Sequence, residues 1–196
     1  VYANAELRYG AAQIQGDALF ITWSEGVKAS VYIDGAIVSG RYGNFGAIGH
    51  FIVVEDGRPC YCGSRGCLEM YASGYAFRDA IQAARASGQA SLQPLDIFPH
   101  AESGDPFARQ VVAESIPYLA SALASLIRLT DISQIVLLGT FARGGDYLLT
   151  QLYDSVAGRL PGVVRSNLTM RLGSQYVMET IVRAAAAPAL ASYFAL

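Results

Sequence analysis

Apolar residues gather into short runs and helical stripes that predict an alternation of strands and helices. Runs rich in β-branched and other apolar residues predict strands at 19–23, 29–33, 36–39, 134–138 and 167–172. Asp34-Gly35 separates two of these runs, and this pair is typical of a tight hairpin turn. We therefore expect a β-hairpin in the first quarter of the chain and a buried strand at 134–138.

The longest predicted helix begins at Asp105-Pro106, because aspartate caps a helix N-terminus and proline suits its first turn. Its apolar spacing continues to about Leu129, and Pro117 is expected to kink it. Other helices are expected at 2–13 with a break at Gly10, and at 68–73, 74–87, 146–159 and 178–194. Two connecting segments are expected, a loop with one short element at 88–104 and a linker at 161–166.

Composition narrows the class of protein. The 196 residues are 53% hydrophobic and 15% charged, which is enough to bury a substantial core. The net charge of −2 does not favour a phosphate backbone as a partner, so DNA binding would need a segment outside this chain. No long apolar run or basic leader indicates a membrane span or signal peptide. A chain without an initial methionine and with a helix already under way is expected to be a fragment.

All three cysteines and one of the two histidines fall within residues 46–73. They are His50, Cys60, Cys62 and Cys67, and three thiolates with one imidazole form the closed Cys₃His set of a structural zinc site. A strained disulfide or simple packing of buried thiols would be alternatives. However, three cysteines cannot all pair, and glycines at 57, 63 and 66 suit a tight metal-binding loop. Clustered thiols of this kind favour a reducing cytoplasm.

This segment resembles the signature of the ROK family (repressors, open reading frames and sugar kinases). Members carry Gly-Glu-x-Gly-His followed by Cys-x-Cys-Gly-x-x-Gly-Cys-x-Glu, and the match here extends from His50 to Glu69. The resemblance implies an actin-like, ribonuclease-H-like α/β fold, with 1–196 as the C-terminal lobe plus part of the N-terminal lobe. It further implies that zinc stiffens a sugar-binding cleft, with His50 and Glu69 near sugar hydroxyls. Asn44 is a further sugar-binding candidate, although it could equally hold the turn at 42–46.

The chain departs from the family kinases at three places. Ala47 replaces the glutamate of Gly-Glu-x-Gly-His, so one hydroxyl acceptor is lost. The catalytic aspartate would lie either before the chain or at Tyr2, so the general base is absent. Of the glycines in the phosphate-binding loop only Gly26 remains, and Glu25 adds a negative charge there. Lys28 alone could still attract a phosphate, but an ordinary surface turn is the better interpretation.

The adenosine-binding region of the family kinases is matched only in part. The Gly139-Thr140 pair partly matches the Gly-Gly turn that meets the adenosine, and a structural turn explains this pair equally well. The alanine-rich segment 182–190 matches the closing helix of the family, which lies beside the nucleotide.

Three functions fit these residues. The favoured one is the sugar-sensing and oligomerising effector region of a ROK transcriptional regulator, whose helix-turn-helix segment lies outside this chain. Its expected ligands are structural zinc and a sugar or sugar phosphate. The alternatives are an ATP-dependent sugar kinase and a zinc-stabilised interaction module without sugar binding. Kinase chemistry needs a base and backbone donors around the phosphates, whereas a sensor needs only a ligand that prefers one of two conformations.

Overall fold

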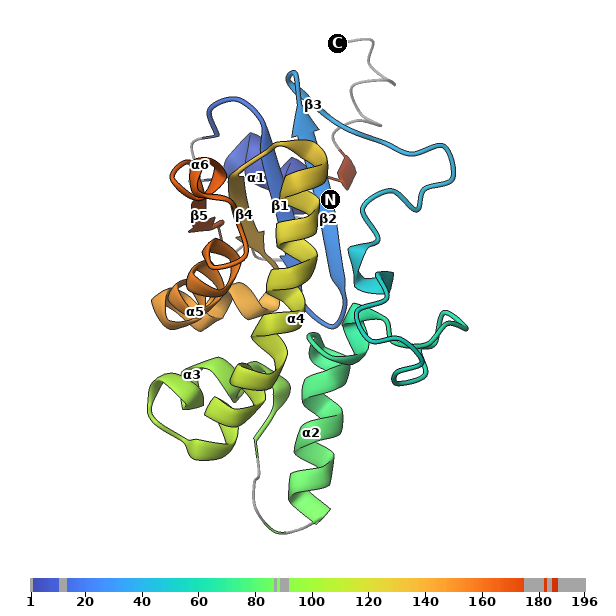
Figure 1. Ribbon diagram of the computed structural model, residues 1–196, viewed down its shortest axis with the longest axis vertical. Helices are drawn as coiled ribbons and strands as arrows, with labels where there is room; N and C mark the ends of the chain where they lie inside the picture. Colours follow the sequence, from blue (N-terminus) through green and yellow to red (C-terminus); the bar gives the residue numbers. More distant parts are fainter. Residues whose placement is uncertain are drawn as a thin grey trace.

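A five-stranded mixed sheet forms the centre of the computed structural model (Figure 1). The structure describes residues 2–10, 14–86, 88, 92–174, 182, 185 and 186. The strand order is β3-β2-β1-β4-β5. The strands are β1 (Ala18–Trp23), β2 (Val27–Ile33), β3 (Ala36–Ile37), β4 (Gln134–Leu138) and β5 (Thr169–Leu172).

The pairing directions divide the sheet into two parts. Strands β1, β2 and β3 form an antiparallel meander, whereas β4 pairs in parallel with both β1 and β5. Phe20 of the central strand β1 stands opposite Ser30 on one side and Val136 on the other. The hairpin predicted at Asp34-Gly35 is confirmed, and both residues have the positive φ that such a tight turn requires. Strand β3 ends two residues earlier than predicted.

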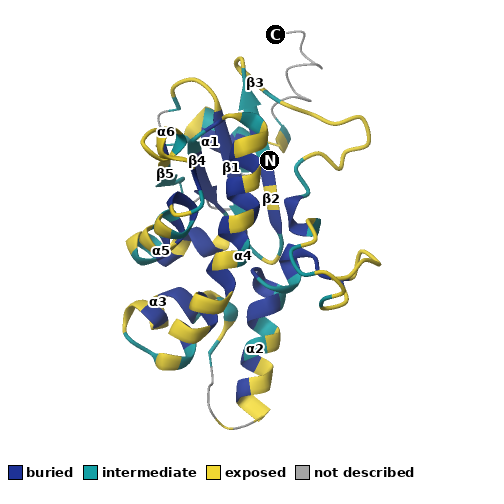
Figure 2. Cartoon of the chain, viewed as in Figure 1, coloured by how far each residue is buried: buried dark blue, intermediate teal, exposed yellow. Residues whose placement is uncertain are grey.

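Helices cover both faces of the sheet. Leu19 and Ile21 of β1 point into a large core shared with α4 (Pro106–Thr130) and α5 (Gly145–Ala157). Phe20, between them in sequence, points to the opposite face and packs with Ala3 of α1 (Tyr2–Tyr9). Both faces of β1 are therefore buried, which explains its unbroken apolar sequence. Figure 2 shows the buried stripe of α4 that faces the sheet.

The helix α4 begins as the sequence predicts. The Asp105 carboxylate accepts the N–H of Ala108 at 2.8 Å, and Pro106 occupies the first helical position. The helix continues through Pro117 to Thr130. By length and composition α4 is the one helix of the described chain that could cross a membrane, but 61% of its most apolar window is buried. It is therefore the core helix of this fold.

The remaining helices are α2 (Gly74–Ala86), α3 (Ile97–Glu102), α6 (Gly162–Arg165) and the short 3₁₀ helices η1 (Ile48–His50), η2 (Leu68–Met70), η3 (Pro94–Asp96) and η4 (Thr140–Gly144). Of these, α2 and η2 lie near their predicted positions, η3 and α3 fall in the segment predicted as a loop with one short element, and η1 and η4 were not predicted. The segment 161–166, predicted as a linker, folds instead into α6, because Pro161 accepts N–H bonds from Val164 and Arg165 and starts a turn. Most of the helix predicted at 178–194 lies outside the described residues.

Candidate metal and ligand site

The metal-ligand segment folds back on itself so that distant residues meet. Residues 51–53 run antiparallel to 66–68, with Ile52 bridged to Cys67 and the Leu68 N–H donating to the Phe51 carbonyl at 2.8 Å. This pairing brings His50, at the end of η1, beside Cys67. A second tight turn between Cys60 and Gly66 completes the loop, and Gly63 and Gly66 both have positive φ. The glycines predicted to permit a tight loop therefore have that role at 63 and 66.

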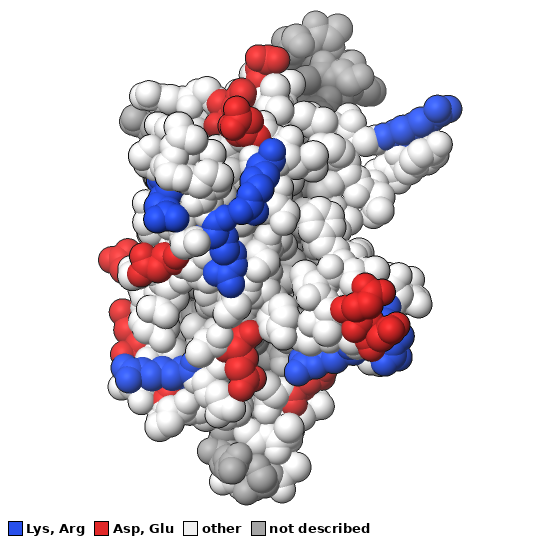
Figure 3. Space-filling view, viewed as in Figure 1, with Lys and Arg blue, Asp and Glu red and all other residues white. Residues whose placement is uncertain are grey.

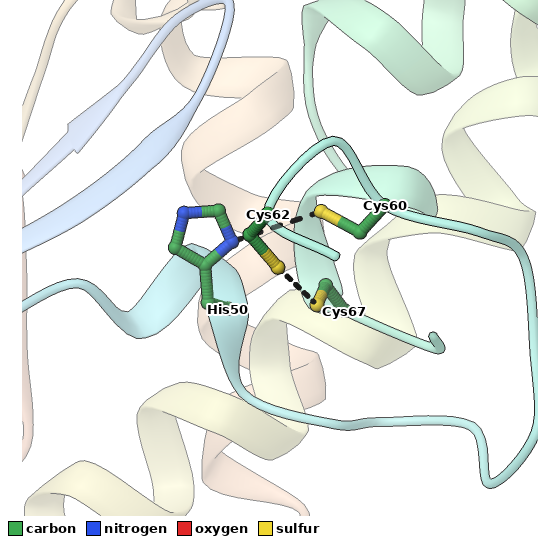
Figure 4. Close-up of side chains that lie close together, drawn as sticks. All are labelled: His50, Cys60, Cys62 and Cys67. Atoms are coloured by element: carbon green, nitrogen blue, oxygen red, sulfur yellow. Dashed lines mark hydrogen bonds between the residues drawn. The ribbon is translucent and has the colours of Figure 1, made fainter. Parts of the chain in front are cut away.

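The four predicted ligands converge (Figure 4). Their ligand atoms all lie within 4.8 Å of one another. The Nδ1 atom of His50 lies 3.8 Å from the Cys60 sulfur, and the sulfurs of Cys62 and Cys67 are 3.6 Å apart. A tetrahedral ion with metal–sulfur bonds of about 2.3 Å places its sulfurs about 3.8 Å apart. A disulfide needs sulfurs about 2 Å apart, so the three free thiols fit metal coordination and not a disulfide.

The thiols of this loop differ in acidity. The pKa of Cys62 is lowered, chiefly because its sulfur accepts a hydrogen bond from the Ser64 backbone. Burial raises the pKa of Cys67 to about 12, and hydrogen bonds that its thiol donates to the other two cysteines add to this effect. A cation at this position would favour all three thiolates and would displace their protons.

Glu69, the predicted hydroxyl acceptor, lies in η2 and is only 2% exposed. Its Oε1 atom accepts the backbone N–H of Val27 at 2.9 Å. A Cβ atom on Gly26 or Gly49 would lie 2.5 or 2.3 Å from the same oxygen, so both glycines are required for this close approach. The carboxylate is thus held between the β1–β2 turn and the segment that carries His50.

The second oxygen of Glu69 accepts the hydroxyl of Tyr61, a residue that sequence reasoning missed. The hydrogen bond to this carboxylate, followed by burial, raises the pKa of Tyr61 above its usual value. The Tyr61 ring also lies edge-on to His50 and beside Tyr75, with both ring centroids 5.4 Å away. The one available signal was its position between Cys60 and Cys62, which fixes it close to the predicted ligands.

Asn44, the third predicted sugar-binding residue, differs from Glu69 in its exposure to solvent. Asn44 is exposed, and its carbonyl accepts the N–H of Ala47 at 3.3 Å within the loop before η1. Its side chain is not hydrogen-bonded to any residue that the structure describes. The backbone contact agrees with the alternative role of Asn44 in the 42–46 turn, whereas its contact with a sugar stays a prediction.

The turn at 24–26, which by resemblance corresponds to the phosphate-binding loop of the family kinases, is hydrogen-bonded to the start of α2. The Ser24 carbonyl accepts the N–H of Gly74 at 3.0 Å, and the Ser24 hydroxyl accepts the N–H of Thr140 at 2.9 Å. Glu25 forms an ion pair with Arg78, one turn into α2. A surface turn was expected here, and the structure shows a hairpin turn with specific partners.

Three hollows open on the surface of the described residues. One of about 810 Å³ is lined by Asp17, Asp131 and Arg171 at the edge of the sheet where β1, β4 and β5 begin. Two others, of about 440 and 360 Å³, lie on either side of Tyr118 on α4. Acidic and basic side chains are scattered over the face in Figure 3 without a patch of one sign. This face therefore offers no continuous basic surface for nucleic acid.

Comparison with known proteins places this geometry in a family. The sequence profile described as "ROK family" matches residues 1–177. The DNA-binding transcriptional dual regulator NagC of Escherichia coli is 33% identical over 183 residues, covering 86% of this chain and 45% of NagC. An N-acetylmannosamine kinase of Citrobacter koseri is 35% identical over 132 residues, covering 67% of this chain and 44% of the kinase. The chain thus spans less than half the length of these two relatives.

Two solved structures of ROK family proteins have a similar fold. A ROK family transcriptional regulator, described as a homologue of the E. coli MLC protein, superposes with a TM-score of 0.82 at 29% identity, covering 93% of this chain and 48% of that one. A ROK family glucokinase from Streptomyces griseus, in complex with glucose and AMPPNP, gives 0.80 at 29% identity, covering 93% and 63%. The fold therefore has actin-like sugar kinases and regulators as neighbours. Sequence profile, relatives and fold all agree that the chain belongs to the ROK family.

Proposed function

We propose that this chain is the sugar-binding effector region of a ROK transcriptional regulator without kinase activity. The observation that carries this proposal is that hydrogen bonds and an ion pair hold the turn at 24–26. In a phosphate-binding loop, backbone N–H groups must be free to face the ligand. Here the N–H of Val27 donates to Glu69, and the carboxylate of Glu25 stands at the turn in an ion pair with Arg78. A nucleotide phosphate would meet a negative side chain and an occupied donor.

The sugar side of the site supports a sensor. Because His50 Nδ1 faces the thiols, its Nε2 atom remains for a ligand hydroxyl. Glu69 supplies a carboxylate whose several lone pairs can accept hydroxyl groups, and Asn44 is a third candidate. Ala47 removes one acceptor, which lowers affinity without abolishing recognition. A regulator needs only that the sugar prefers one of two conformations, so an altered phosphate loop does not impair it.

The metal proposed for this site is a structural zinc. His50, Cys60, Cys62 and Cys67 would hold it, and their separations suit tetrahedral coordination. An ion held by four protein ligands has no open position for a reacting water. Its contribution would be to cross-link the loop that carries Tyr61 to the segment that carries His50.

The relatives support a proposal for the wider arrangement. NagC is described as DNA-binding, and we propose that DNA contact is made by a helix-turn-helix segment outside this chain. Such a regulator would act in the cytoplasm as a homo-oligomer, without a membrane partner. The relatives also include an N-acetylmannosamine kinase and a glucokinase with bound glucose and AMPPNP, so a sugar kinase is the second candidate. An interaction module without sugar binding is the third.

A thermal-shift screen separates these functions. The protein would be heated with N-acetylglucosamine, N-acetylmannosamine, glucose and their phosphates, each with and without magnesium ATP. We expect a saturable rise in melting temperature with a sugar, none with magnesium ATP, and no sugar phosphate among the products. Sugar phosphate formation would establish the kinase. No shift with any sugar, in a sample that carries zinc, would favour the interaction module.

A further inference from the structure

The contacts of Glu69 differ between its two oxygens. Oε1 is enclosed by backbone, since it accepts the Val27 N–H and packs against Gly26 and Gly49. Oε2 is covered by a side chain, the phenol of Tyr61. The backbone of the β1–β2 hairpin and of the 3₁₀ helix η1 cannot move away from Oε1 without local unfolding. The Tyr61 side chain, in contrast, can leave Oε2 by changing its rotamer. The Tyr61 side is therefore the route by which a ligand can reach this buried carboxylate.

Tyr61 is placed so that it can move. The residue is 65% exposed, although its hydroxyl reaches a carboxylate that is 2% exposed. Its ring is held by an edge contact with His50 and a tilted contact with Tyr75 and is not enclosed on all sides. Rotation outward would break one hydrogen bond to a charged acceptor and two ring contacts. It would leave the backbone between Cys60 and Cys62 unchanged.

We propose that Tyr61 is a gate, whose phenol occupies the position of a ligand hydroxyl on Glu69 until a ligand displaces it. The part of this inference that concerns sugars rests on the proposed function, whereas the closure of Glu69 rests on the contacts alone. An incoming hydroxyl replaces the phenol as the donor to Oε2, so the number of hydrogen bonds on the carboxylate is preserved. The exchange avoids leaving a buried charge without a partner.

The Tyr61 phenol also indicates which chemical group of a ligand can replace it on Glu69. A phenol is a neutral O–H donor, and Glu69 is an acceptor when ionised. A phosphate group would bring a second negative charge to this position. The position on Glu69 therefore takes a neutral hydroxyl of a polyol or sugar and rejects the phosphate of a sugar phosphate.

Carboxyl labelling tests the gate without any ligand. The protein would be treated with a water-soluble carbodiimide and an amine, and the modified peptides quantified by mass spectrometry. Exposed Glu55 and buried Glu6 serve as internal references for reactive and protected carboxylates. We expect Glu69 to be protected in the parent protein and to become several-fold more reactive in Tyr61→Ala. The matched control is Tyr42→Ala, which removes a tyrosine that is 87% exposed and should leave Glu69 protected.

Two results would overturn the gate. One is that Glu69 in the parent protein reacts as fast as Glu55, and the other is that Tyr61→Ala leaves it fully protected. Metal content and circular dichroism establish that each variant is folded. If Tyr61→Ala does not fold, Tyr61→Phe keeps the ring, removes only the hydroxyl, and should still raise the reactivity of Glu69. Unchanged reactivity in a folded Tyr61→Phe would then decide against the gate.

Calorimetric titration with N-acetylglucosamine and glucose supplies the second arm. Loss of the internal hydrogen bond should tighten sugar binding in Tyr61→Phe by about tenfold, the factor that corresponds to one such bond to a charged group. Equal affinity in the parent and Tyr61→Phe would overturn the gate while leaving a sugar site in place. A different outcome is that Glu69 becomes reactive to the carbodiimide in Tyr61→Ala while neither sugar gives a binding heat with any variant. This outcome would support the gate and count against the sugar-sensing function.

Discussion

The Glu69 carboxylate accepts the backbone N–H of Val27 at 2.9 Å. This bond joins the last residue of the metal-ligand signature to the turn that by resemblance corresponds to the phosphate-binding loop of family kinases. The residue proposed to contact a sugar is therefore also a structural element of the β1–β2 hairpin. A ligand that bound Glu69, as proposed, would therefore be coupled to the conformation of this hairpin through a single carboxylate.

Replacing Glu69 should consequently affect stability as well as binding. Glu69→Ala leaves the buried Val27 N–H without its acceptor and creates a small cavity beside Gly26 and Gly49. We expect a loss of about 2–4 kcal/mol in the free energy of unfolding. Glu55→Ala, at an exposed position of the same segment, should change it by less than about 0.5 kcal/mol. Denaturant unfolding of the two variants measures the difference, and equal stabilities would disprove the structural role.

The close approach of Gly49 to Glu69 gives a steric prediction. A methyl group at position 49 would lie 2.3 Å from Oε1, so Gly49→Ala must displace the carboxylate or the η1 turn. We expect a destabilisation of about 1–3 kcal/mol. Gly162→Ala is the control, because nothing lies within 4 Å of its added carbon and its φ is not positive. Thermal melting compares the two, and a neutral Gly49→Ala would show that this packing is not tight.

Loss of one metal ligand should release the ion. Cys62→Ser removes one thiolate of the proposed set, and the metal's binding energy contributes to folding in such loops. We expect the zinc content to fall from about one per chain, and the melting temperature to fall with it. Arg65→Ala changes an exposed side chain of the same loop and should keep its zinc. Elemental analysis of both proteins is the measurement, and full zinc retention in Cys62→Ser would refute the assignment.

Metal binding should also depend on pH. Burial raises the pKa of Cys67 to about 12, so its thiol is protonated at neutral pH in the absence of metal. Only the thiolate binds the metal, and each proton displaced weakens apparent affinity up to tenfold for every unit that the pH falls. We expect zinc affinity to decrease steadily from pH 8 to pH 6. Competition with a chromophoric chelator measures this slope, and a pH-independent affinity would contradict thiolate coordination.

Sequence periodicity predicted the strands and the longer helices α2, α4 and α5, and ligand spacing predicted the metal cluster, because both depend on residues close together in the chain. The strands, the Asp105 cap of α4 and the meeting of His50 with the cysteines were all predictable in this way. The contacts of Glu69 with Val27 and of Glu25 with Arg78 were not, since each joins segments more than 40 residues apart. Tyr61 was missed because an exposed tyrosine in a loop gives no periodic signal, and only the fold reveals its carboxylate partner.

The most direct test of the sugar-sensing proposal is calorimetric titration of the zinc-loaded protein with N-acetylglucosamine and glucose, in parallel with Glu69→Gln. The glutamine keeps the shape of the side chain but removes its charge, and Glu55→Gln controls for the loss of a carboxylate elsewhere. We predict saturable binding of one sugar to the parent and to Glu55→Gln, weakened at least tenfold in Glu69→Gln, the effect of about one charged hydrogen bond. Identical affinities in all three proteins, or no binding to the parent, would contradict the proposal that Glu69 is the centre of a sugar site.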